Sequence, residues 1–187
     1  MRMEYYYIKD SLFKQEYTLS RAQEYIEMIL YSIVAFSLPF ILGHEQLLVG
    51  SVVNCALVLA ALNLRGARLL PVIILPSVGV ILAGMVFGSQ SASLIYMLPF
   101  IWLGNTFLVF AVKELALSGK KNRLVALGAG AFAKTAFLFS AAFALLSFGL
   151  VPVQFITAFG IFQLATALCG GTAALGMQEV KRRFAIA

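Results

Sequence analysis

Residues 124–148 read LVALGAGAFAKTAFLFSAAFALLSF, an apolar run of 25 residues with one charged side chain, Lys134, near its centre. At about 1.5 Å of rise per residue, a helix of this length crosses a bilayer core of about 30 Å. Lys134 would then lie about 15 Å from either membrane face, too deep for its side chain to reach the headgroups. An intramembrane cation usually faces a bundle interior, a wet cavity or a partner charge.

Two interpretations of Lys134 remain open from the sequence. By the span assignment below, none of the eight carboxylates of the chain lies deep in a membrane span, so Lys134 has no obvious internal counter-ion. In the first interpretation, its partner is an anionic or strongly hydrogen-bonding ligand. In the second, the amine is neutral, or it bonds carbonyl and amide groups of neighbouring helices.

The composition predicts an integral membrane protein. Of 187 residues, 61% are hydrophobic and 12% are charged, whereas soluble domains have about 25% charged residues. The net charge of +6 does not indicate nucleic-acid binding, because the basic residues lie between apolar runs, where they act as topology signals. Cys55 and Cys169 lie inside apolar runs without metal-site spacing, so we expect no metal centre or cofactor.

Six apolar runs predict an all-α bundle of six transmembrane helices, at about 26–42, 47–63, 69–87, 94–113, 124–148 and 153–177. The predicted transmembrane domain is therefore 26–177. Residues 1–25 are predicted as a cytoplasmic or interfacial N-terminal segment, with Tyr5, Tyr6 and Tyr7 as interfacial aromatics. Residues 178–187 are predicted as a basic cytoplasmic tail.

The distribution of basic residues predicts the orientation of the bundle. Of the fourteen Lys and Arg residues, all except Lys134 fall in the N-terminal segment, the second and fourth connections and the C-terminal tail. The connections near His44, Ser89 and Gly149 contain none. An even number of spans places the basic segments on one side, and the positive-inside rule assigns that side, with both termini, to the cytoplasm.

Four polar residues on four different spans lie at similar predicted depths, between the outer half and the midplane. They could line one ligand pocket, or they could form interhelical hydrogen bonds worth about 0.6 kcal/mol each. Trp102 and Tyr96 are candidate aromatic walls of this pocket, and Thr166 shares one helix face with Gln163. The candidate ligand-binding residues are Lys134, Gln163, Asn105, Asn54, Trp102, Tyr96 and Thr166.

His44 and Glu45 lie in the first outer loop, where they either gate a pocket or form an ordinary solvated loop. The only histidine has no neighbouring Ser or Cys, and the spans lack acids, so we expect no catalytic site and no enzyme activity. Ser118 to Lys121 does not form a phosphate-binding loop, because Lys121 stands where that motif needs Ser or Thr. The chain is therefore not expected to hydrolyse ATP itself.

The six-span plan, Leu98 to Asn105 (LPFIWLGN) and Ala133-Lys134 with Phe137 carry a family resemblance. The chain resembles the substrate-binding S components of energy-coupling factor (ECF) transporters, six-helix membrane proteins of bacteria and archaea. The resemblance covers about residues 26–177. It implies a prokaryotic cell-membrane protein that captures a vitamin or similar micronutrient from outside, in a pocket near the outer half of the bundle.

The resemblance also implies partners: a membrane coupling protein and two cytoplasmic ATPases. The first helix of the family commonly offers an AxxxA surface to the coupling protein. The candidates here are Ser32, Ala35 and Ser37, although Phe36 and Pro39 break the four-residue spacing.

The alternative function is a non-transporting membrane scaffold or anchor subunit of a larger complex. Small residues at four-residue spacing, such as Thr166, Gly170 and Ala174, permit the close helix approach that this function needs.

Overall fold

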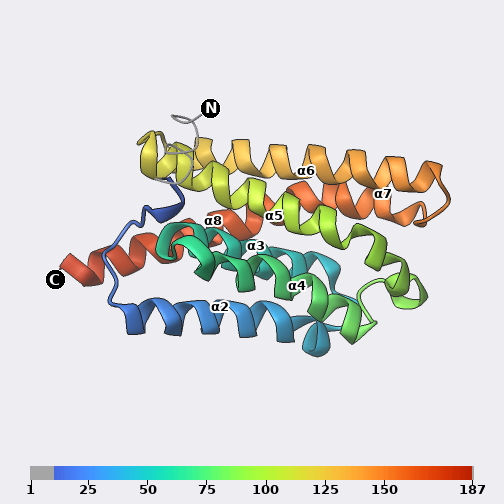
Figure 1. The fold of residues 1–187 in the computed structure, drawn as a ribbon, viewed down its shortest axis with the longest axis horizontal. Coiled ribbons are helices and arrows are strands. Elements are labelled where there is room, and N and C mark those ends of the chain that lie inside the picture. Colours follow the sequence, from blue (N-terminus) through green and yellow to red (C-terminus); the bar gives the residue numbers. More distant parts are fainter. Residues whose placement is uncertain (1–10, 187) are drawn as a thin grey trace.

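The computed structural model describes residues 11–186, which form an elongated bundle of helices without any strand (Figure 1). Six helical segments are long and apolar enough to cross a membrane, at 21–42, 46–63, 66–83, 90–118, 123–147 and 154–184. The predicted all-α architecture with six spans is therefore confirmed. The predicted interfacial Tyr5, Tyr6 and Tyr7 lie outside the described residues.

Six long helices build the bundle: α2 (Arg21–Leu42), α3 (Gln46–Asn63), α4 (Leu69–Ala83), α5 (Leu98–Val112), α6 (Arg123–Ser147) and α8 (Ile161–Ile186). Shorter elements extend them. A 3₁₀ turn, η1 (Gly66–Arg68), precedes α4, and a longer 3₁₀ segment, η2 (Gly88–Met97), precedes α5. A π-helical turn, η3 (Lys113–Ser118), follows α5, and the short α7 (Gln154–Phe159) precedes α8.

The first helix, α2, starts at Arg21 and not at the predicted residue 26, because Ser20 and Gln23 form a capping box there. The Ser20 hydroxyl accepts a hydrogen bond from the Gln23 backbone N–H, and the Gln23 side chain accepts one from the Ser20 backbone N–H. Such reciprocal bonds satisfy amide donors that a helix start otherwise leaves unpaired. At the other terminus, α8 continues to Ile186, so the predicted basic tail lies on helix through most of its length.

The last span, predicted as one continuous helix at 153–177, is broken at Gly160. Its backbone has φ −96° and ψ −108°, outside the helical region, so α7 and α8 are separate helices. A Cβ at this position would lie 2.6 Å from the Ile156 carbonyl oxygen, a contact that only glycine avoids.

Helix α3 lies at the centre of the bundle and packs against α2, α4, α5 and α8. Its closest neighbour is α8, and small residues make this approach feasible. A Cβ at Gly170 would clash with the Ser51 carbonyl oxygen, and Ala174 is fully buried. The stripe of Thr166, Gly170 and Ala174 is therefore used for helix packing within the chain.

Two apolar clusters fill the interior at opposite ends. One contains Leu57 to Leu62 of α3 with residues of α4, α5 and α8, and the other contains Leu94, Leu138 and Phe155 with their neighbours. On α3, α5, α6 and α8, the predicted polar residues lie between or next to the residues of these clusters; they are Asn54, Asn105, Lys134 and Gln163. A polar layer thus interrupts the apolar interior.

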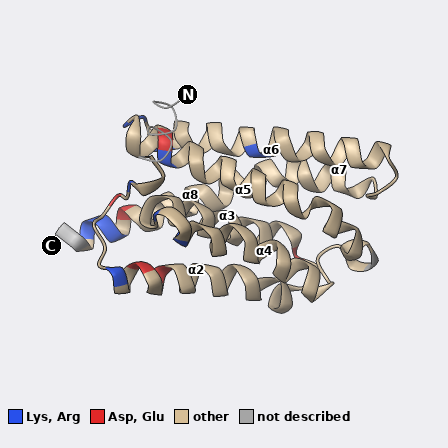
Figure 2. Cartoon of the chain, in the orientation of Figure 1, with Lys and Arg blue, Asp and Glu red and all other residues tan. Residues whose placement is uncertain are grey.

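The charged residues gather at the end of the bundle where the N and C labels lie (Figure 2). We call this the basic end; the opposite end carries the loops near His44, Ser89 and Gly149. Two charged residues are exceptions: Lys134 lies midway along α6, and Glu45 lies just before α3 at the opposite end. The basic connections therefore lie at one end of the bundle, as the distribution of Lys and Arg between the spans predicts.

Residues 11–16 cross the basic end and tie its helices together. Glu24, fully buried, forms ion pairs with Arg65 and Arg68 and accepts a hydrogen bond from Gln15. The Lys113 ammonium, also fully buried, donates to the backbone carbonyls of Lys14 at 2.6 Å and Leu64 at 2.8 Å. Further bonds join the same segment to α6 and α8, because Arg123 and Gln178 both donate to Glu16. Gln178 also bonds to Asn63 at the end of α3.

Candidate ligand-binding site

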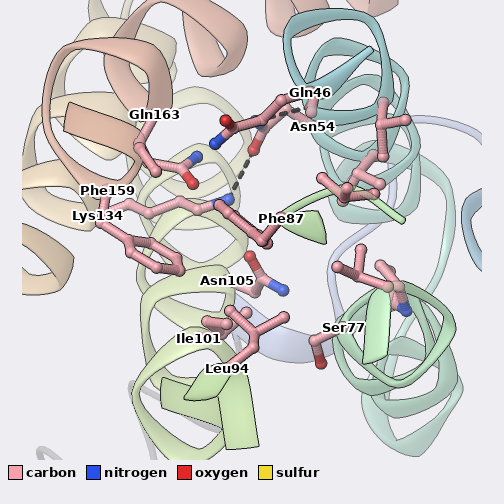
Figure 3. A pocket seen from close by; sticks show the side chains of 17 residues that line it. Gln46, Asn54, Ser77, Phe87, Leu94, Ile101, Asn105, Lys134, Phe159 and Gln163 are labelled. Atoms are coloured by element: carbon pink, nitrogen blue, oxygen red, sulfur yellow. Dashed lines mark hydrogen bonds between the residues drawn. The ribbon is translucent and has the colours of Figure 1, made fainter. Parts of the chain in front are cut away.

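A cavity of about 100 Å³ lies in the polar layer, in the half of the bundle away from the basic end. It is lined by residues of α3, α4, α5, α6, η2, α7 and α8, together with Val86 and Phe87 of the loop after α4. Four predicted residues from four helices line it: Asn54, Asn105, Lys134 and Gln163 (Figure 3). The prediction that these residues share one layer is therefore matched by their positions in the structure.

Lys134 enters the cavity from α6 and is 2% exposed. Its Nζ donates a hydrogen bond of 2.6 Å to Oδ1 of Asn54, and Figure 3 shows this bond. An ammonium carries three donors, and the remaining ones have no partner among residues 11–186. No carboxylate of the described residues pairs with Lys134.

Asn54 is held by its own helix and by α8, so its oxygen is presented to Lys134. Its Nδ2 donates to the Gly50 carbonyl at 2.9 Å and to the Thr166 hydroxyl at 3.2 Å. Thr166 in turn donates to the Gln163 carbonyl at 3.1 Å. Both amide hydrogens and the amide oxygen of Asn54 are therefore hydrogen-bonded. Thr166 holds Asn54 in place but does not line the cavity itself.

Asn105 is fixed in the opposite way, with its oxygen left open. Its Nδ2 donates to the Ile73 carbonyl at 2.9 Å, and the side chain is 2% exposed. Only the NH₂ group can donate to a carbonyl, so this bond sets the orientation of the amide. Oδ1 receives no hydrogen bond from residues 11–186 and points toward the side of the cavity where Lys134 ends (Figure 3).

Two glutamines complete the polar lining. The side chains of Gln163 on α8 and Gln46 at the start of α3 line the cavity and are half-buried. Neither side-chain amide hydrogen-bonds to another described residue. Ser77 differs, because its hydroxyl accepts from Trp102 Nε1 and donates to the Ile74 carbonyl, both at 2.9 Å.

The aromatic walls are not the predicted ones. Phe87 and Phe159 line the cavity, and their ring centroids lie 6.3 Å apart with nearly parallel planes. Trp102 lies outside the lining and reaches the site only through Ser77. Tyr96 is 48% exposed and does not line the cavity.

A second hollow, of about 360 Å³, lies next to the cavity toward the end away from the basic residues. Gln46, Val86 and Phe87 line both spaces, so Phe87 stands between them. His44 lines this outer hollow, which we call the vestibule, together with Gln90 and Gln154. Glu45 precedes α3, is exposed and does not line the vestibule.

The predicted docking residues lie mainly inside the chain. Ser32 is 5% exposed and Ala35 is fully buried, and α2 packs along this side against α4. A Cβ at Gly79 of α4 would clash with the Phe36 carbonyl oxygen, which shows how close the two helices are. Ser37 is half-buried and donates to the carbonyl of Ile33 in its own helix. The surface that α2 exposes is a different, apolar face that includes Ile26, Ile33 and Ile41.

A larger groove, of about 400 Å³, lies on the outer face between α2, α3 and α8. Its lining includes Leu30, Val34, Leu59 and Met177 and no charged side chain. Lipid chains are as apolar as this surface, so its size alone does not indicate a solute site. The smaller cavity is the better candidate because buried polar groups converge there.

The cavity offers hydrogen-bond donors, one open acceptor and two free amides, but no nucleophile beside a base. Among residues 11–186, no cluster of His, Cys, Asp and Glu has the arrangement to hold a metal ion. The geometry supports binding of a compact polar group.

Comparisons of the chain with protein-family models, curated proteins and solved structures gave no match.

Proposed function

We propose that the chain is a membrane solute-binding subunit that takes up a small micronutrient, vitamin-like or related. The observation that carries the proposal is the Lys134 amino group, 2% exposed, which ends in a cavity with one bond to Asn54 and its other hydrogens unpartnered among residues 11–186. A polar group buried without a partner costs about 1–3 kcal/mol. A ligand that accepts these hydrogens removes the cost and gains affinity from it.

The path to the cavity supports the same proposal. The vestibule lies toward the end opposite the basic residues, and the positive-inside rule makes that end the extracellular one. A solute then enters from outside, and both termini of this multi-pass protein lie in the cytoplasm of a prokaryotic cell.

Release of the solute to the inside needs energy from another component. We propose that a membrane coupling protein and cytoplasmic ATPases supply it, as the resemblance to ECF S components implies. The buried position of Ser32 and Ala35 makes the exposed apolar face of α2 the better docking candidate on this helix.

The first test is ligand-induced thermal stabilisation of the purified protein in detergent. We expect at least one member of a panel of vitamins and purine-like compounds to raise the unfolding temperature. Lys134→Met keeps most of the side-chain length, removes the donors and should abolish the rise. Lys120→Met is the matched control, because Lys120 is exposed at the basic end and should leave the rise unchanged.

Native mass spectrometry after mild purification tests the same proposal without a panel. A small molecule retained by the unmodified protein and lost from Lys134→Met would support it. If no compound stabilises the protein and no small molecule is retained, the solute-binding function is wrong.

A further inference from the structure

The hydrogen bonds inside the cavity indicate which chemical group of the small solute binds there. This inference rests on the proposed function, because it concerns the same cavity. The sequence predicted an anionic or strongly hydrogen-bonding ligand as one interpretation of Lys134, without choosing between the two kinds of ligand. The structure adds two observations that separate them: which polar atoms are already paired, and how large the cavity is.

The atoms already paired leave a specific set open. Asn54 and Ser77 have both donor and acceptor functions in use. The groups that remain for a ligand are the Lys134 donors and Asn105 Oδ1, with the Gln163 and Gln46 amides beside them. Lys134 and Asn105 are each 2% exposed, so both depend on a ligand or bound water for further hydrogen bonds.

These two groups make opposite demands. Lys134 needs an acceptor, and Asn105 Oδ1 needs a donor, and Figure 3 shows the Asn105 oxygen turned toward the side where Lys134 ends. A carboxylate has only acceptor oxygens, so it satisfies Lys134 and leaves Asn105 Oδ1 without a donor. An amide edge, in which C=O and N–H stand side by side, satisfies both.

The volume of the cavity limits the size of the group. At about 100 Å³, it is smaller than an apolar cavity of about 150 Å³ that holds benzene. A five-membered lactam or cyclic urea has as many heavy atoms as benzene, so it would occupy the cavity and extend toward the vestibule, which shares Gln46, Val86 and Phe87 with it. The rest of a larger ligand would have to lie in the vestibule, whose lining includes Gln90, Gln154 and His44.

We propose that the cavity binds the neutral cis-amide edge of a compact lactam, imide or cyclic urea group. The carbonyl accepts from Lys134, and the adjacent N–H donates to Asn105 Oδ1. The rings of Phe87 and Phe159 cover the apolar part of the group.

The test uses small compounds of nearly equal shape. 2-Pyrrolidinone and cyclopentanone differ by N–H against CH₂, and propanamide and propanoate differ by an amide against a carboxylate. Stabilisation of the purified protein is measured at up to about 10 mM, a range suited to fragments of so few atoms. We expect about tenfold tighter binding of the lactam than of the ketone, and of the amide than of the carboxylate.

Two variants assign the preference to residues. Asn105→Leu should remove the lactam-over-ketone preference and keep binding of the ketone. Lys134→Met should weaken the lactam and the ketone by the same factor, because both use the carbonyl. Circular dichroism and size-exclusion profiles establish that each variant is folded. If Asn105→Leu does not fold, the lactam-over-ketone and amide-over-carboxylate comparisons in the unmodified protein still decide the inference.

The outcomes separate this inference from the proposed function. Tighter binding of propanoate than of propanamide, lost in Lys134→Met, would overturn the amide preference and leave the solute-binding function intact. A vitamin-panel ligand together with no response to lactam or amide would also overturn it. No response to any compound, with no retained molecule, would overturn both.

Discussion

The protein has two buried lysines without a carboxylate partner among the described residues, and their surroundings differ. Lys113, at the basic end, donates to two backbone carbonyls, those of Lys14 and Leu64. Lys134, in the polar layer, donates to one amide oxygen and otherwise faces a cavity. The same residue type is therefore a structural crosslink in one place and an open binding group in the other.

The difference extends to the regions around the two lysines. At the basic end, Asn63 and Gln178 hydrogen-bond to each other, and residues 11–16 join the network through Gln15, which donates to Glu24, and Glu16, which accepts from Gln178. In the cavity, Asn105 and Gln163 keep side-chain groups without partners among residues 11–186. Buried polar groups usually have hydrogen-bond partners, so polar groups that lack one in the described chain indicate a place where a ligand binds.

The comparison is tested first at Glu24, where we expect the largest loss of stability. Glu24→Ala removes the buried carboxylate that pairs with Arg65 and Arg68 and leaves both guanidinium groups without it. Breaking a buried ion pair costs about 3–5 kcal/mol, and the partial exposure of the arginines favours the lower value, about 3 kcal/mol. Thermal unfolding in detergent measures the loss.

Glu45→Ala is the control for this prediction, because Glu45 is exposed and its side chain makes no capping bond to α3. It should leave the unfolding temperature unchanged. Equal effects of the two substitutions would mean that the basic end is not held by its buried network.

The fold was largely predictable from the sequence, and the reasons are physical. A bilayer requires apolar runs of fixed length, and basic residues mark the connections on one side, so six spans could be placed to within a few residues. The exceptions depended on local geometry. The capping box at Ser20 and the break at Gly160 arise from particular side-chain and backbone contacts.

The candidate site was only partly predictable. Depth along each helix brought Asn54, Asn105, Lys134 and Gln163 into one layer, because rise per residue is constant. It did not find Phe87, which comes from the loop after α4, where Gly84 and Gly88 adopt positive φ angles of 65° and 56°. Nor could it show that Asn54 is fully bonded while Asn105 keeps an open oxygen, since that depends on how neighbouring helices are rotated.

The second test is Lys113→Met, for which we expect a loss of about 2 kcal/mol. The substitution leaves the carbonyls of Lys14 and Leu64 without their charged donor, and hydrogen bonds to charged groups contribute about 1.5–3 kcal/mol. Because one of these carbonyls belongs to the N-terminal segment, residues 11–18 should exchange amide hydrogens faster. Hydrogen–deuterium exchange with mass spectrometry measures this local change.

Lys121→Met serves as the comparison for Lys113→Met, since Lys121 is exposed near the same end. It should change neither the unfolding temperature nor the exchange of residues 11–18. Unchanged exchange in Lys113→Met would show that the segment is held by its other bonds, such as the one from Arg123 to Glu16.

The third test, Lys134→Met without ligand, should have the smallest effect on stability, below about 1 kcal/mol. Two contributions oppose each other: replacing a buried charge with an apolar side chain of similar size is often neutral or stabilising, and Asn54 Oδ1 loses its only donor among residues 11–186. Asn54→Leu alone should destabilise more, because it leaves Lys134 with no hydrogen-bond partner in the described chain. Adding Lys134→Met to Asn54→Leu should then restore stability. A loss in Lys134→Met as large as in Lys113→Met would make the two lysines equivalent and remove the reason to look for a ligand in the cavity.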